Sequence, residues 1–216
     1  MNYASIREMD ISNGDGVGVA LFVQGCHFHC YNCFNSETWD FNGGKEWNED
    51  IKEKFLKLID KPYINRISIL GGEPLADENL EAVLDLVVTI RKLYRKENIV
   101  NTNKQYIVHN KRGAHNILSQ KEDEIRILYP DKTIWIYSGY TWNQIMHPVI
   151  TNDFNPARDK LIKMRKEIVA NCDVLIDGRY VDELRDITLH WRGSSNQRVI
   201  DIQKTLKSNL IISYEE

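Results

Sequence analysis

The sequence predicts an α/β fold in which short buried strands alternate with amphipathic helices. Short, nearly continuous apolar runs are typical of strands in parallel sheets, and segments with helical spacing of apolar residues separate them. The residues that could bind a metal or a cofactor also follow directly after these strands. Because the carboxyl ends of parallel strands build the active sites of α/β folds, this placement supports the same fold class.

The first elements are a strand at residues 17–23, a helix at 48–59 and a strand at 66–70. The strand at 17–23 is almost entirely apolar, and Gln24 and Gly25 end it. The helix at 48–59 has its apolar residues on one face. The strand at 66–70 runs directly into a Gly-Gly-Glu-Pro turn.

The remaining elements are a helix at 77–94, a strand at 133–138, a helix at 157–169 and a strand at 173–177. In the helix at 77–94, Asp77 and Glu78 suit the positive end of the helix dipole. Residues 95–124 have a weak pattern rich in Asn, Lys and Gln. A structureless loop of that length is uncommon in a compact domain, so we expect an insertion there.

Composition indicates one globular domain, residues 1–216. A net charge of −3, with 42% apolar and 27% charged residues, gives no bulk electrostatic case for nucleic acid or an anionic membrane. No apolar run approaches the ~20 residues of a membrane-spanning helix. Arg7, Glu8 and Asp10 argue against a signal peptide. We therefore expect a cytoplasmic protein without direct nucleic-acid or membrane contacts.

Three of the four cysteines, Cys26, Cys30 and Cys33, form a C-x3-C-x2-C motif after the first strand. Disulfides are rare in the cytosol, so a tight cluster of cysteines there favours metal binding. Thiolates are the usual ligands of iron–sulfur clusters. Three of them can hold a [4Fe-4S] cluster and leave one iron open to S-adenosyl-L-methionine. Electron transfer to that cofactor would then give methionine and a 5′-deoxyadenosyl radical.

Two other kinds of site fit the cysteine spacing. A structural zinc site could add His27 or His29 to the three thiolates, although the second, distant ligand pair of most zinc motifs is absent. A plain electron-transfer cluster could take Cys172 as its fourth ligand. Most simply, however, the two histidines are loop residues and Cys172 is a buried small apolar residue.

A second motif follows the second strand and consists of Gly71, Gly72, Glu73 and Pro74. Glycines allow the backbone to approach a ligand closely, and carbonyls there could hold the ammonium group of a methionine moiety. Alone, the motif would be an ordinary strand-to-helix turn. Beside the cysteine motif, it indicates the second part of a cofactor site.

Together these motifs resemble the radical S-adenosylmethionine superfamily. More narrowly, the chain resembles the family of anaerobic ribonucleoside-triphosphate reductase activating proteins. Segments 13–39, 134–141, 177–180 and 192–198 carry that narrower resemblance. The last of them, Arg-Gly-Ser-Ser-Asn-Gln-Arg, is the most specific. The resemblance implies a partial (β/α) TIM-type barrel with an insertion at about residues 95–124.

The resemblance also implies a radical enzyme with a protein substrate. Such an activase removes a hydrogen atom from a glycine in the large subunit of the reductase, which stores the glycyl radical. A flavodoxin or ferredoxin would supply the electron. We expect the insertion at about 95–124 to contact the reductase. Alternatives are an activase of another glycyl radical enzyme, of the formate-lyase type, a small-molecule radical enzyme, and a non-enzymatic zinc or iron–sulfur binding module.

The remaining expectations concern single residues. Many relatives carry Arg where this chain has Gly18, and Gly where it has Asn32, a position that often contacts adenine. Ser138 and Gly139 end a strand, where a hydroxyl could meet the methionine carboxylate or simply form a turn. Asp177 and Arg179 could form a local ion pair or could face the site. Within the segment Ser194 to Arg198, whose role stays open, Ser194, Asn196 and Gln197 could position the glycyl loop or the cofactor, or could cap a turn.

Overall fold

The computed structural model describes residues 1–94, 116–121, 124–128, 132–148 and 155–214. The strands are β1 (Asn2–Asp10), β2 (Gly18–Val23), β3 (Lys45–Glu46), β4 (Arg66–Gly71), β5 (Asn116–Lys121), β6 (Glu124–Leu128), β7 (Thr133–Ser138), β8 (Val174–Asp177) and β9 (Arg198–Asp201). The helices are α1 (Glu49–Ile59), α2 (Leu80–Tyr94), α3 (Trp142–Met146), α4 (Pro156–Ala170) and α5 (Ile202–Ser208).

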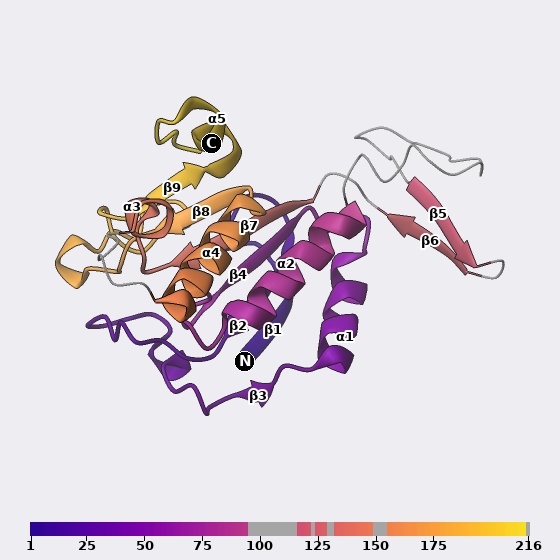
Figure 1. Ribbon diagram of the computed structural model, residues 1–216, viewed down its shortest axis with the longest axis horizontal. Coiled ribbons are helices and arrows are strands. Elements are labelled where there is room, and N and C mark those ends of the chain that lie inside the picture. The colour runs from indigo at the N-terminus through magenta and orange to yellow at the C-terminus, as the bar shows by residue number, and fades with distance from the viewer. Residues whose placement is uncertain (95–115, 122–123, 129–131, 149–154, 215–216) are drawn as a thin grey trace.

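The main sheet has seven strands in the order β3-β1-β2-β4-β7-β8-β9 (Figure 1). The central strands β2, β4, β7 and β8 run parallel, and the outer strands are antiparallel to their neighbours. This arrangement confirms the predicted α/β class. Because β3 and β9 are free edges, the sheet is open and does not close on itself, so the predicted partial barrel is not confirmed.

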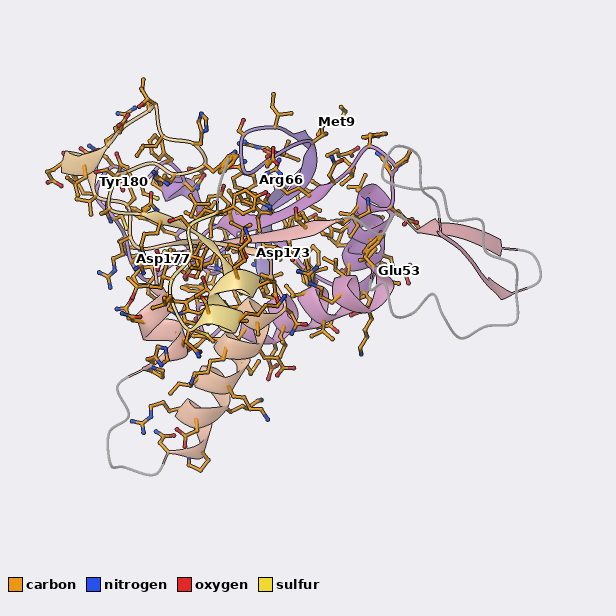
Figure 2. All side chains as sticks on the ribbon, turned by 90° about the horizontal axis from the view of Figure 1, so that it is seen from above. Met9, Glu53, Arg66, Asp173, Asp177 and Tyr180 are labelled. Atoms are coloured by element: carbon orange, nitrogen blue, oxygen red, sulfur yellow. The ribbon has the colours of Figure 1, made fainter. Side chains whose placement is uncertain are left out.

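The helices cover one face of the sheet. Strand residues alternate between the two faces, so Ile134 and Ile136 of β7 join the large core under the helices, whereas Trp135 belongs to a separate cluster. Figures 1 and 2 both show α1, α2 and α4 on the same side of the sheet. The other face carries Phe22 and Leu70, with Tyr137 packed against them. That helix-free face is where a cavity can form.

Helix boundaries follow from local hydrogen bonds. Asn48 caps α1, since its side chain accepts a hydrogen bond from the backbone of Ile51. The helix predicted from residue 77 begins instead at Leu80. The reason is that Asn79 donates from its amide to the carbonyls of Gln24 and Glu73, both at 3.0 Å. Residues 73–79 are therefore tied to the turn before α2.

Some elements were not predicted from the sequence. β1 is an edge-side strand with charged, exposed positions, and β3 and β9 are short, so none of them has a continuous apolar run. Of the insertion predicted at about 95–124, residues 95–115 and 122–123 lie outside the described part. β5 and β6 pair there as an antiparallel hairpin. No described helix is long and apolar enough to cross a membrane.

Candidate functional site

A cavity of about 580 Å³ lies at the carboxyl ends of the parallel strands. It extends over the helix-free face of the sheet, where Phe22, Leu70 and Tyr137 line it. Its walls bring together seven of the residues that the sequence singled out. These are Cys26, Cys30, Cys33, Gly71, Gly72, Ser138 and Gly139. Three loops that are distant in sequence therefore meet in one space.

The cysteine loop, residues 26–35, is held at its start and shaped by two left-handed residues. The N–H of Gly25 donates to Thr38 at 2.8 Å, and that of Cys26 donates to Trp39 at 3.0 Å. His29 and Asn32 have φ values of +46° and +54°. A left-handed conformation is unusual for residues other than glycine, but Asn tolerates it best. The loop thus curls so that its three thiols reach the same cavity.

Burial raises the pKa of two of these thiols. The pKa of Cys26 is raised to about 11, chiefly by desolvation. The pKa of Cys30 is also raised by desolvation, while the backbone N–H of Tyr180 and the guanidinium of Arg179 act in the opposite direction. The thiols of Cys26 and Cys30 are therefore protonated at neutral pH. Metal ligation requires thiolates, so cluster binding would release these protons.

The three thiols of the cysteine loop line one cavity. In the part of the chain that the structure describes, no three His, Cys, Asp or Glu side chains converge on a single-ion position. A four-iron cluster needs each thiolate on a different iron, so its ligands need not converge on a point. Three thiols that line one cavity meet that requirement.

The other suggested ligands are engaged elsewhere. Nε2 of His27 lies 2.9 Å from a carboxylate oxygen of Glu78, and the His29 ring stacks on Trp39 with centroids 4.7 Å apart. Neither histidine lines the cavity with the three thiols. Cys172 is buried in the core under the helices, where its thiol donates to the carbonyl of Ile168. This location argues against Cys172 as a fourth ligand.

The Gly71–Pro74 turn packs directly on the backbone before the cysteine loop. Gly71 has a φ of +104°, and a Cβ on Gly72 would lie 2.4 Å from the carbonyl oxygen of Gly25. Glu73 N–H also donates to that carbonyl at 2.7 Å. Glycine is thus required at position 72 because a side chain would force the two loops apart.

Glu73 is buried, does not line the cavity and holds two strand ends together. Its carboxylate accepts hydrogen bonds from the Ser138 hydroxyl at 2.9 Å and from Gly139 N–H at 2.7 Å. Burial raises the pKa of Glu73 to about 7, against the effect of these donors. Pro74 is buried beside it. The hydroxyl of Ser138 points to Glu73, so its predicted contact with a methionine carboxylate stays a prediction.

Residues 178–185, which we call the clamp segment, contact the cysteine loop through hydrogen bonds and aromatic rings. Asn32 donates from its amide to a carboxylate oxygen of Asp182 at 2.9 Å, across 150 residues of sequence. Tyr180 donates from its hydroxyl to the other oxygen at 2.6 Å and stacks edge-on against Phe34. Asn32 itself does not line the cavity. Its predicted role in cofactor contact therefore stays a prediction, and its observed partner is the clamp.

Arg179 completes this clamp. Its guanidinium lies 4.3 Å from the ring centroid of Phe28, a residue that stands between Cys26 and Cys30 in the sequence. Phe28 in turn fills the space over Gly139, where a Cβ would lie 2.3 Å from the ring. Arg179 therefore lines the cavity and also fixes the loop, which answers the question that its sequence position left open.

Residues 194–198, the tail, form hydrogen bonds to the clamp segment. Asn196 donates to the carbonyl of Arg179 at 2.8 Å, and Gln197 donates to that of Gly178 at 3.0 Å. The Ser194 hydroxyl accepts from Val181 N–H at 3.2 Å. The 194–198 tail thus holds the clamp segment by hydrogen bonds, and its Gln197 also lines the cavity.

The next pair along this tail is an ion pair. Arg198 donates to both carboxylate oxygens of Asp177, with the Nε–Oδ1 distance at 2.9 Å. Asp177 also accepts from Trp142 N–H at 2.7 Å. Asp177 therefore pairs with Arg198, not with Arg179, which lies over the Phe28 ring.

Gly18 makes room for a buried arginine from the neighbouring strand. A Cβ at position 18 would lie 2.9 Å from the guanidinium of Arg66, its register partner on β4. Arg66 donates to the Asp10 carbonyl at 2.6 Å and pairs with the Asp10 carboxylate at 3.0 Å. Gly18 therefore leaves space for the Arg66 side chain, labelled in Figure 2, which pairs with Asp10 and does not line the cavity.

Sequence reasoning missed several residues of the cavity wall. Phe28 lies inside the cysteine motif, and Tyr137 and Arg192 lie within motifs that carried the resemblance, so attention to non-ligand positions could have found them. Arg7 also lines the cavity, and no motif marked it because β1 was not predicted.

Comparisons with known proteins extend over most of the chain. A family model described as a 4Fe-4S single cluster domain matches residues 12–122 and 108–200. The anaerobic ribonucleoside-triphosphate reductase-activating protein of Vibrio cholerae is 28% identical over 199 residues, covering 91% of this chain and 96% of the relative. The proteins of the same name from Escherichia coli strain K12 (29% identity, 92% and 97% coverage) and Enterobacteria phage T4 (28%, 92% and 93%) are similarly close.

Proposed function

This chain belongs to the family of 4Fe-4S single cluster domains, and we propose that it activates an anaerobic ribonucleoside-triphosphate reductase by generating a glycyl radical on it. The observation that carries this proposal is the convergence of three cysteines of one loop and the Gly71–Gly72 turn on one cavity. Relatives that align along nearly the whole chain carry the same activity in their names.

In this proposal Cys26, Cys30 and Cys33 are the thiolate ligands of a [4Fe-4S] cluster. The backbone at Gly71 and Gly72 faces the same cavity and offers carbonyl groups to the ammonium of S-adenosyl-L-methionine. Ser138 and Gly139 border the cavity on the opposite strand end, beside the methionine moiety. Glu73 and Pro74 lie outside the cavity wall and support it. The Glu73 carboxylate, in the turn after β4, accepts hydrogen bonds from Ser138 and Gly139 at the end of β7.

When bound, the cluster and S-adenosyl-L-methionine supply the one-electron cleavage and the radical that removes hydrogen from a glycine Cα. The chain's own residues provide a confined space for that chemistry. Phe28 and Tyr180 enclose the cysteine loop with aromatic surface, and the clamp segment keeps the three thiols in one arrangement. Such confinement keeps water away from reactive species.

Three further parts of the proposal concern surroundings and architecture. A flavodoxin or ferredoxin donates the electron, and the protein works in the cytoplasm with its reductase.

The parallel strands β2, β4, β7 and β8 form part of a (β/α) barrel, within one domain of residues 1–216. The insertion at about 95–124 is a further contact with the reductase, and deleting it should weaken complex formation without changing cluster assembly.

The decisive experiment mixes the anaerobically reconstituted protein, a reductant, S-adenosyl-L-methionine and the large reductase subunit. We expect the doublet of a glycyl radical in the EPR spectrum, with methionine and 5′-deoxyadenosine as products. A Cys30→Ser variant should give neither the doublet nor the products, since it removes one cluster ligand. A competent reductase that develops no doublet, although S-adenosyl-L-methionine is cleaved, would overturn the assignment of the target.

A further inference from the structure

Residues 186–193 form an ordered turn at the mouth of the cavity, which we call the rim turn. An antiparallel bridge between Arg185 and Ser194 closes its base. Asp186 N–H donates to the carbonyl of Gly193 at 3.2 Å, and the Asp186 carboxylate accepts from both the N–H and the hydroxyl of Thr188. The rim turn is therefore shaped by its own hydrogen bonds before any partner binds.

The rim turn exposes an isoleucine beside the site. Ile187 is 83% exposed, and it lines the mouth of the cavity together with Phe34, which is 56% exposed. A single exposed apolar residue needs no explanation, but a group of them at a site marks a binding surface. Tyr31 on the cysteine loop is also exposed. Met9 of β1 is exposed as well, and Figure 2 shows it with Tyr180 on the side of the sheet away from α2 and α4.

Arginine side chains gather at this mouth, and several have a carboxylate neighbour within the chain: Arg7 lies 4.0 Å from Asp10, and Asp182 and Asp186 interact electrostatically with Arg185 and Arg192. Arg7, Arg179 and Arg192 line the cavity, and among its described lining residues the only carboxylate is that of Asp186, which is hydrogen-bonded within the rim turn. Arg185 adds a fourth guanidinium, 5.4 Å from the ring centroid of Phe34. Arginine and aromatic side chains are enriched at protein interfaces and at their energetic hot spots. The surface thus suits a polypeptide segment that carries apolar groups.

On the basis of the proposed activase function, we propose that Ile187 and Phe34, with the surrounding arginines, dock the glycine-bearing polypeptide segment of the reductase. The target glycine must approach the cysteine loop, and the rim turn and Phe34 border the entrance to that space. A small-molecule substrate would enter the cavity without needing an apolar surface outside it. A protein substrate needs such a surface to hold its segment in place.

The test compares Ile187→Asp with Leu210→Asp in the reconstituted holoprotein. Both replace an exposed apolar residue by the same charge, but Leu210 does not line the cavity. Binding of the full-length large reductase subunit is measured by biolayer interferometry. Iron content, and 5′-deoxyadenosine formed with dithionite in the absence of reductase, report on the cofactor site independently. Light scattering reports the oligomeric state.

We expect Ile187→Asp to weaken reductase binding by about tenfold or more, as for an interface hot spot. Its iron content and reductase-independent cleavage should stay within about twofold of the parent, and Leu210→Asp should bind like the parent. Unchanged reductase binding by Ile187→Asp would overturn the docking proposal, as would a change only in self-association. If the parent itself fails to bind or activate the reductase, the proposed function fails instead.

Discussion

The buried carboxylate of Glu73 accepts a hydrogen bond from the hydroxyl of Ser138 at 2.9 Å. This bond joins the turn after β4 to the end of β7, two neighbouring parallel strands. Because the same carboxylate binds Gly139 N–H, Glu73 fixes the distance between the two loops that border the cavity opposite the cysteines. The Glu of the Gly-Gly-Glu-Pro motif is thus a positioning residue whose side chain lies behind the site.

Replacing Ser138 by Ala should destabilise the protein by about 1–2 kcal/mol, since it removes a donor from a buried carboxylate. Tyr140 N–H also loses its acceptor, the Ser138 hydroxyl. The free energy of unfolding of the metal-free protein, from urea titration, measures the effect. Ser195→Ala, at an exposed position, is the control and should change stability little. Equal effects of the two changes would contradict the role given to the Glu73–Ser138 bond.

Glu73 should also make stability depend on pH. Because burial raises its pKa from 4.5 to about 7, the folded protein binds more protons than the unfolded chain between these values. This contribution therefore makes stability fall as pH rises from about 4.5 to about 7, by at most about 1.4 kcal/mol per pH unit. Urea midpoints between pH 5 and pH 8 for the parent and Glu73→Gln test this.

In that experiment the Gln variant should show a flatter pH profile, whatever its absolute stability. Glu183→Gln, at an exposed carboxylate, is the control and should keep the parental slope. A Glu73→Gln profile parallel to that of the parent would mean that the titrating group lies elsewhere.

Asp182→Ala should shorten the lifetime of the bound cluster. The change removes the contact between the clamp segment and Asn32, which lies between two of the cysteines. We expect several-fold faster loss of visible cluster absorbance in the presence of an iron chelator. Asn32→Ala removes the same bond but keeps the bond between Tyr180 and Asp182, so its effect should be smaller, and the double variant should be no worse than Asp182→Ala alone. Additive effects would show that the two residues act independently.

Arg66→Met should destabilise the protein by about 3–5 kcal/mol, because it leaves the buried Asp10 carboxylate without its ionic partner. Arg66 and Asp10 are 0% and 2% exposed, whereas Arg7, which also approaches Asp10, has a side chain that is 58% exposed. Arg7→Met is therefore the control and should cost at most about 1 kcal/mol. Urea unfolding measures both. If Arg66→Met were tolerated as easily as Arg7→Met, the buried pair would contribute little to the fold.

The sequence alone determined the elements with a continuous apolar run or a clear helical period. β2, β4, β7 and β8 lie where their Val and Ile content predicts them, because strands buried on both faces must be apolar throughout. The cysteine spacing and the Gly-Gly-Glu-Pro turn likewise indicated the cofactor site. Both are local features, in which neighbouring residues define the chemistry.

Only the tertiary structure decided which distant residues complete that site. Asp182 meets Asn32 across 150 residues, and Arg66 fills the space left by Gly18 on the adjacent strand. Such contacts depend on strand order and register, which a one-dimensional pattern does not encode. For the same reason, the sequence marked Glu73 and the 194–198 tail as important. In the fold, both form hydrogen bonds to the loops that surround the cysteines, and Gln197 of the tail also lines the cavity.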